Sequence, residues 1–162
     1  MLINNVILEM KRVYEDDLKG IEHTLNVLKY AELIMRTENL GSEIEEIILI
    51  SAILHDIGIP EAIHKYGSSK GVYQETEGEV IARDILERLK YDPDKVKRIC
   101  YIVGNHHTKH KIDGLDFQII WEADMLVNLE NKGLSKEELM QYIDNFKTEV
   151  GRNLVYKKYI IE

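Results

Sequence analysis

One apolar segment constrains the fold of this chain more than any other. Residues 47–54 read IILISAIL, without a charged side chain, and the polar pair His55-Asp56 follows at once. An apolar run of this length fits either a buried strand or a buried helix. Ser42 followed by Glu45 has the pattern of a capping box, and the length from there favours a helix. Because a helix that is apolar on all faces lies inside a bundle, two polar side chains end the most buried element.

The rest of the chain also shows helical patterns. Its 162 residues carry apolar side chains at three- and four-residue spacing, and both prolines lie at expected boundaries. Further helix starts are indicated by Thr76 with Glu79, by Ser135 with Glu138, and by Asp92 before Pro93. These patterns predict helices at residues 3–14, 17–38, 43–56, 76–90, 93–106, 115–130 and 135–147.

Two loops and a tail complete the chain. The residues from Gly58 to Tyr73 and from Thr108 to Gly114 are expected to be loops, and the tail NLVYKKYII fits either a strand or a packed extension. We therefore predict an all-α fold, a single-domain bundle of about six to seven helices over residues 1–162. The tail packs on its own domain or on a second copy, so a homo-oligomer stays open.

The composition excludes several classes of function. A net charge of −8 disfavours a protein that coats nucleic acid or binds an anionic membrane surface, since both need basic surfaces. Cys100 is the single cysteine, which rules out an internal disulfide and a cysteine-based zinc site. We expect no membrane span and no secretory signal, and hence a cytoplasmic location. A small anionic substrate stays compatible, because one site needs only a few local cations.

Several polar side chains fall on apolar faces of the predicted helices, namely His23, His55, Asp56, His106, His107 and Asp124. A lone histidine there is more often a core residue with a satisfied hydrogen bond, and a lone aspartate is more often a cap or an ion-pair partner. Six such residues would each need a separate explanation, because burying an unpaired carboxylate or imidazole costs free energy. A shared divalent metal satisfies them all. Imidazole and carboxylate ligands suit iron, manganese, nickel, cobalt or zinc, and we expect one or two ions.

The order of these residues resembles the HD superfamily of metal-dependent phosphohydrolases. Four segments carry the resemblance: HTLNVLKYAELI (23–34), AILHDIG (52–58), IVGNHHT (102–108) and WEADMLVN (121–128). A His-Asp dipeptide alone carries no weight, whereas the ordered set is specific. The resemblance covers about residues 17–130 and implies an HD-type helical bundle, with a C-terminal helix and tail at 135–162.

The resemblance also implies a role for each polar residue. The four ligands of a primary metal ion are matched by His23, His55, Asp56 and Asp124. His106 and His107 match the histidines that help to bind a second ion in dinuclear members. Asp56 would bridge two ions, which makes it a catalytic residue.

The chain departs from known branches of that family. Dinuclear members often carry another histidine before the paired histidines, where this chain has Gln74 or Glu77. Glu77 is therefore a candidate ligand or catalytic base. Nucleoside-monophosphatase members have a glutamate where this chain has Ile59. Cyclic-dinucleotide phosphodiesterases have GYP after the paired histidines, where this chain reads TKHKIDG. The branch is thus left open.

The two expected loops carry cations that an acidic chain needs in order to bind phosphate. Lys65 and Lys70 follow Asp56, and Lys109 follows His107. We expect these three lysines to bind the phosphate of the substrate. The alternative is that they are ordinary solvated loop residues.

The expected function is hydrolysis of a small phosphate ester, with a nucleotide as one candidate, by attack of metal-bound hydroxide. A small phosphorylated molecule is then the expected partner. One alternative is a di-iron oxygenase on the same helical scaffold. The other is a non-enzymatic sensor domain that binds a metal structurally.

Overall fold

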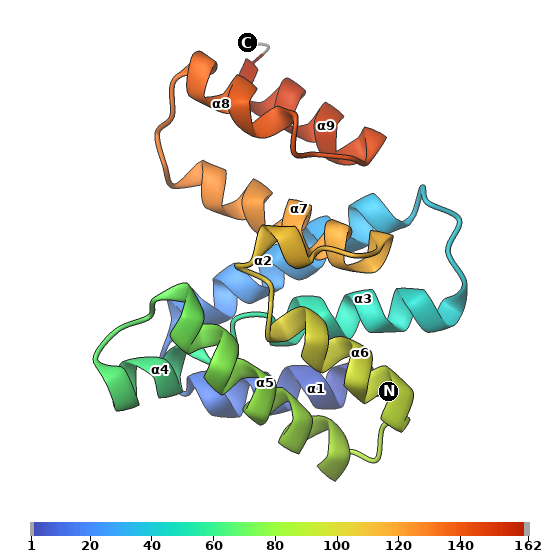
Figure 1. Ribbon diagram of the computed structural model, residues 1–162, viewed down its shortest axis with the longest axis vertical. Coiled ribbons are helices and arrows are strands. Elements are labelled where there is room, and N and C mark those ends of the chain that lie inside the picture. Colours follow the sequence, from blue (N-terminus) through green and yellow to red (C-terminus); the bar gives the residue numbers. More distant parts are fainter. Residues whose placement is uncertain (1, 161–162) are drawn as a thin grey trace.

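The computed structural model describes residues 2–160 and is built from helices (Figure 1). No strand occurs in that range, and the all-α prediction is confirmed, with nine α-helices rather than six to seven. The helices are α1 (Leu2–Tyr14), α2 (Leu18–Met35), α3 (Ser42–Leu54), α4 (Ile59–Tyr66), α5 (Gly71–Arg88), α6 (Pro93–Val103), α7 (Leu115–Glu130), α8 (Lys136–Ile143) and α9 (Glu149–Val155). Two short turns are the 3-10 helix η1 (Lys109–Lys111) and the π-helix η2 (Tyr156–Ile160). The outermost residues of the predicted 1–162 domain, 1 and 161–162, lie outside the described range.

The prediction of one long loop from Gly58 to Tyr73 is wrong, because most of this segment is helical. α4 begins directly after Gly58 and carries Pro60 in its first turn, where a proline is well tolerated. It ends at Gly67, whose φ of 63° is the left-handed conformation that commonly follows a helix. The glycines of this segment mark helix ends rather than a continuous loop.

Two of the four capping signals are misleading. Ser42 begins α3, but Gly41 occupies the N-cap position and makes no side-chain hydrogen bond. Thr76 lies inside α5, which begins at Gly71, and its hydroxyl donates to a backbone carbonyl one turn earlier. The other two signals are confirmed, at Asp92 for α6 and at Ser135 for α8.

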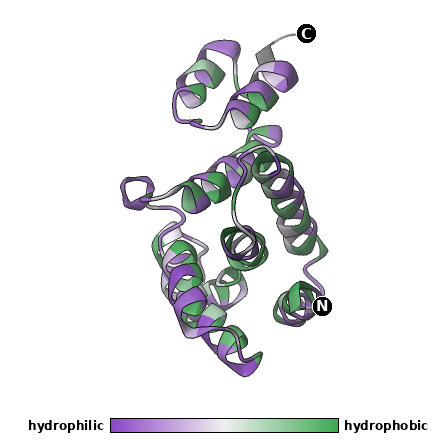
Figure 2. Ribbon diagram, turned by 90° about the vertical axis from the view of Figure 1, so that its right-hand side faces the viewer, coloured by the Kyte–Doolittle hydropathy of each residue, from purple (hydrophilic) through white to green (hydrophobic). Residues whose placement is uncertain are grey.

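α3 lies between two hydrophobic cores, which explains why it is apolar on all faces. Ile48 and Ala52 pack in the core formed with α2 and α7. Ile50, Ile53 and Leu54 pack in the core formed with α1, α5 and α6. All five side chains are fully buried, and complete burial of a leucine or isoleucine stabilises a fold by about 1.5–3 kcal/mol. Figure 2 shows the hydrophobic residues gathered on the inward faces of the helices.

The stretch Ser42–Tyr66, which comprises α3, the following turn and α4, is long and apolar enough to cross a membrane by length and composition alone. In the structure, 61% of its apolar window is buried inside the bundle. The turn at residues 55–58 also interrupts it with polar side chains. The stretch therefore behaves as the core helix of a helical bundle, followed by a short second helix.

A buried carboxylate in the middle of α7 holds the segment that connects α8 to α9. Glu122 of α7 is fully buried and accepts hydrogen bonds from the backbone N–H groups of Lys147 and Thr148 and from the Thr148 hydroxyl. Burial raises the pKa of Glu122 to about 7, although these bonds favour its ionised form. The tail is helical over residues 153–160 rather than a strand. It packs on its own chain, where Lys158 pairs with Glu130 of α7.

A close contact between two glycines places α5 against the turn that follows α3. A Cβ atom at Gly58 would lie 2.3 Å from the carbonyl oxygen of Gln74 and 2.5 Å from the backbone nitrogen of Gly78. The φ of Gly58 is −79°, which any residue can adopt, so the position requires glycine for space alone. This contact brings the first half of α5 next to Asp56.

We expect Gly58→Ala to destabilise the fold, because the added methyl group meets backbone atoms that cannot move aside. Overpacking of this kind costs about 1–3 kcal/mol, measurable as a lower urea midpoint. Gly41→Ala is the matched control, since a Cβ there meets nothing within 4 Å. Equal losses in the two variants would show that α5 does not depend on this contact.

Candidate metal centre

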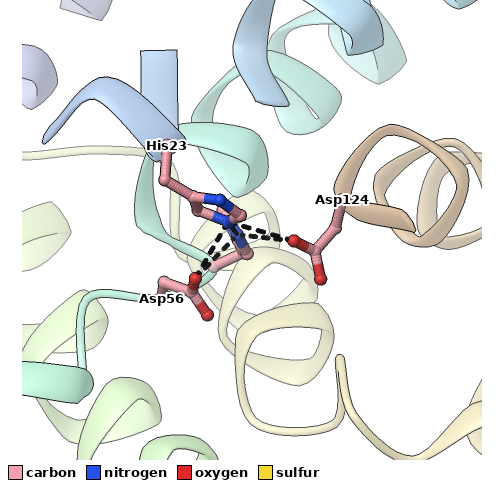
Figure 3. Close-up of side chains that lie close together, drawn as sticks. His23, Asp56 and Asp124 are labelled. Atoms are coloured by element: carbon pink, nitrogen blue, oxygen red, sulfur yellow. Dashed lines mark hydrogen bonds and ion pairs between the residues drawn. The ribbon is translucent and has the colours of Figure 1, made fainter. Parts of the chain in front are cut away.

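Four polar side chains from three helices meet at one point. His23 comes from α2, His55 and Asp56 follow the last residue of α3, and Asp124 comes from α7. Each offers one ligand atom, and these atoms all lie within 4.8 Å of one another. Figure 3 shows the side chains of His23, Asp56 and Asp124 turned toward one another. The structure thus brings together the four residues expected to bind a primary metal.

The distances between the ligand atoms suit a single transition-metal ion. Nε2 of His23 lies 3.1 Å from Oδ1 of Asp124 and 3.2 Å from Oδ2 of Asp56. Nε2 of His55 lies 3.3 Å from Oδ2 of Asp56 and 3.4 Å from Nε2 of His23. Ligands about 2.0–2.2 Å from one ion are separated by about 3.0–3.5 Å at tetrahedral or octahedral angles. The four residues therefore fit such an ion without rearrangement.

Hydrogen bonds to groups outside the cluster orient two of these side chains. Nδ1 of His55 lies 2.7 Å from the carbonyl oxygen of Ala52, so Nδ1 donates to that oxygen and Nε2 is directed into the cluster, where it would offer its lone pair once deprotonated. The side-chain amide of Asn128, one turn after Asp124, donates to Oδ1 of Asp124 at 3.1 Å. The ligand atoms are held in place by the fold.

The charges of the cluster are strongly coupled. Burial alone would lower the pKa of His23, but its hydrogen bonds to Asp124 and Asp56 outweigh burial and raise the pKa to about 9. Burial would also lower the pKa of His55, but the negative charge of Asp56, together with hydrogen bonds to Asp124 and Asp56, raises it. Burial would raise the pKa of Asp56, yet the positive His55 and the hydrogen bonds from neighbouring histidines hold it well below its usual range. Before a metal binds, the cluster consists of imidazolium–carboxylate pairs.

A second group of ligand atoms adjoins the first through Asp56. Its other oxygen, Oδ1, lies 3.1 Å from Nε2 of His106, and one ligand atom from each of Asp56, His106 and His107 lies within 4.8 Å of the others. Nδ1 of His106 is 2.8 Å from the carbonyl oxygen of Val103, and this contact directs Nε2 of the same ring at Asp56. Nε2 of His107 instead lies 2.8 Å from Oε1 of Gln74.

α5 holds the turn that carries the paired histidines. Glu75 accepts hydrogen bonds from the backbone N–H of His107 and from the hydroxyl of Thr108, each at 2.9 Å. A Cβ at Gly71 would lie only 3.0 Å from Cβ of His107. Gln74 donates to the carbonyl oxygen of Ser69 while it accepts from His107, which links the loop before α5 to the histidine.

The other predicted site residues lie away from the metal ligands. Both carboxylate oxygens of Glu77 are engaged, one by Lys65 at 2.9 Å and the other by the hydroxyl of Tyr66 at 2.8 Å. Lys70 is exposed at the start of α5, and Lys109 contacts Asn145 near the Trp121 ring. None of the three lysines, nor Glu77, lines the cleft at the metal ligands, because α4 draws Lys65 toward α5 and η1 turns Lys109 toward the C-terminal helices.

Three of the four candidate ligands, His23, Asp56 and Asp124, line a cleft of about 370 Å³. Six residues that sequence reasoning did not assign to the site also line this cleft: Tyr14, Asp17, Lys19, Gly20, Ile59 and Asn128. Lys19 precedes His23 by four residues and Asn128 follows Asp124 by four residues, so each shares a helix face with a predicted ligand. That spacing is a signal that could have identified both.

Comparisons with known proteins agree with this arrangement. The HD domain family model matches residues 20–147. A crystal structure described as a predicted HD superfamily hydrolase, from an uncultured Thermotogales bacterium, is similar with a TM-score of 0.72. The identity is 22%, over 95% of this chain and 83% of that chain, and at this level the likeness supports the fold. No curated protein matches. A family match over most of the chain, with its histidines and aspartates meeting at one point, shows that this chain belongs to the HD domain family.

Proposed function

We propose that the chain is a metal-dependent phosphohydrolase that acts on a small phosphate monoester. The observation that carries this proposal is the convergence of two imidazole nitrogens and two carboxylate oxygens beside an open cleft. Membership of the HD domain family and the similar fold of a predicted HD superfamily hydrolase support a metal-dependent hydrolase. A divalent transition metal supplies Lewis acidity, which polarises a phosphoryl oxygen and lowers the pKa of water.

The chain's own residues supply positioning, which is most of what phosphoryl transfer requires of a protein. His55, fixed by the carbonyl of Ala52, directs Nε2 at the common point. Asp56 divides its two oxygens between His23 and His106, so it joins the two groups of ligands. Asn128 keeps Asp124 in place. A preformed arrangement of this kind costs little reorganisation during the reaction.

The number of bound ions distinguishes a phosphohydrolase with one metal ion from the alternative, a di-iron oxygenase. We favour one ion, held by the four residues of the primary cluster. In the second group, Nε2 of His107 is already hydrogen-bonded to Gln74. Glu77, the other candidate in that part of α5, is bound to Lys65 and Tyr66.

We expect purified protein to carry about one transition-metal ion per chain and His55→Ala to lose it, because removal of one ligand breaks a four-ligand site. Elemental analysis measures the content, and circular dichroism establishes that the variant is folded. His64→Ala is the matched control, since its side chain is 82% exposed. A wild-type protein that takes up no metal, prepared with or without reductant, would contradict the site.

Metal binding should release protons at neutral pH. His23, with a pKa of about 9, is protonated at pH 7 and must lose its proton to become a ligand. Because protons compete with the metal, affinity should rise as the pH increases from about 6 to 9, by up to about tenfold per unit for each proton released. Calorimetry in buffers of different ionisation enthalpy measures the release. A binding enthalpy that does not depend on the buffer would show that the imidazoles are already neutral.

The protein loaded with Mn²⁺ should release phosphate from p-nitrophenyl phosphate. Asp124→Asn should lower kcat/KM by about a hundredfold or more, because it removes an anionic ligand from the centre. Asp94→Asn, on the exposed start of α6, should leave the rate unchanged. Bound metal without turnover of any phosphate ester would overturn the phosphohydrolase and favour a sensor domain.

A further inference from the structure

A second cleft continues from the metal centre. It has a volume of about 470 Å³ and shares Lys19 and His23 with the cleft described above. Its other lining residues come from α2 and from the end of α7: Glu22, Asn26, Val127, Glu130 and Asn131. We call this second cleft the distal groove. A molecule bound beside His23 thus has a neighbouring space for the part that does not react.

Lys19 is the only lysine or arginine that lines either cleft in the described part of the chain. Its side chain is exposed, and its ammonium group makes no hydrogen bond or ion pair within residues 2–160. Lys19 and His23 lie one turn apart on the same face of α2. The N-terminus of α2 is already capped by Asp17, which accepts from the backbone N–H of Gly20 at 3.0 Å. The positive charge that an anion would meet is therefore the Lys19 ammonium.

The turn that carries Lys19 is fixed relative to the metal ligands. The hydroxyl of Tyr14 donates to the backbone carbonyl of Asp56 at 2.8 Å. A Cβ at Gly20 would lie 2.6 Å from the Tyr14 ring, so the first turn of α2 rests directly on this tyrosine. Tyr14 therefore acts as a positioning residue between Asp56 and the backbone of Lys19.

The surface of the distal groove is more polar than apolar, and most of its lining residues carry hydrogen-bonding groups. The side chains of Glu22, Asn26 and Asn131 make no hydrogen bond among the residues described here, whereas Glu130 is engaged by Tyr30 and Lys158. A carboxylate accepts a hydrogen bond, and an amide both donates and accepts. Hydroxyl groups of a ligand satisfy these side chains, because a hydroxyl both donates and accepts.

Two other kinds of leaving group, a nucleoside and a group that carries a second phosphate, fit the distal groove poorly. A nucleobase gains affinity by stacking on an aromatic face, and no aromatic side chain lines the described part of this groove. Tyr14, in the first cleft, is only 4% exposed. A second phosphate would face the carboxylate of Glu22, which makes no ion pair among the described residues, and like charges repel.

We propose that the substrate is a phosphate monoester of a sugar or another polyol that carries no nucleobase. Lys19 binds the phosphoryl group, and Glu22, Asn26 and Asn131 bind the hydroxyl groups of the leaving alcohol. Lys19 is then the substrate-binding cation of this site. The assignment rests on the proposed phosphohydrolase function and narrows its substrate class.

The test compares esters that share a phosphoryl group but differ in the alcohol. Mn²⁺-loaded protein is assayed with ribose 5-phosphate, glycerol 3-phosphate, AMP, ADP and p-nitrophenyl phosphate. We expect kcat/KM to be at least about tenfold higher for the polyol esters than for AMP, and ADP to be a poor substrate. Lys19→Ala should raise KM for every monoester by about tenfold or more, because it removes a charged hydrogen bond. Lys97→Ala, an exposed lysine of α6, is the matched control.

The variant Asn26→Ala tests the contribution of the distal groove independently of phosphate binding. It should lower the ratio of kcat/KM for ribose 5-phosphate to that for p-nitrophenyl phosphate by about tenfold, since only the sugar reaches the amide. If AMP is preferred to the polyol esters, or if this ratio does not change, the polyol assignment fails while the phosphohydrolase stands. If metal-loaded protein hydrolyses none of the esters, the proposed function fails, and the polyol assignment fails with it.

Discussion

The buried carboxylate of Asp56 is the interaction on which the rest of this structure depends. An ionised carboxylate removed from water is costly unless opposite charges and hydrogen bonds surround it. Here one oxygen meets His23 and His55, and the other meets His106, while Tyr14 binds the backbone carbonyl. These partners come from α1, α2, the end of α3 and the turn after α6. Satisfying one buried charge thus determines where four parts of the chain must meet.

α3 makes that meeting point possible. Its side chains fill two hydrophobic cores at once, so the helix is held on all sides and its last turn cannot move. A polar pair placed directly after such a helix is carried to the centre of the molecule. Charged neighbours offset the desolvation of His55 and Asp56. The hydrophobic burial of α3 keeps these two residues in position. The burial of α3 therefore both stabilises the fold and positions the candidate site. Residues 47–56 have to meet both requirements.

The sequence could point to the four residues that the structure brings together, because His23 and Asp124 are polar residues on apolar helix faces and His55-Asp56 directly follows a buried helix. Periodicity therefore identified His23 and Asp124, although they are 101 residues apart. It failed between Gly58 and Tyr73, because a glycine needed for close packing looks the same in sequence as a glycine in a loop. Lys65 and Lys109 have no periodic pattern that fixes their direction, and the structure pairs them with Glu77 and Asn145. Only tertiary contacts decide such partners.

Charge balance in the centre explains why a separate cation is needed beside it. Before metal binds, two imidazolium groups oppose the carboxylates of Asp56 and Asp124. If a divalent ion replaced those two protons, the sum of the charges would stay close to zero. Under the proposed function, a phosphate dianion would then meet a centre with Lewis acidity but little net positive charge, inside a protein of net charge −8. Further attraction would have to come from a residue outside the ligand set, and Lys19 lies one helical turn from His23, where it could provide it.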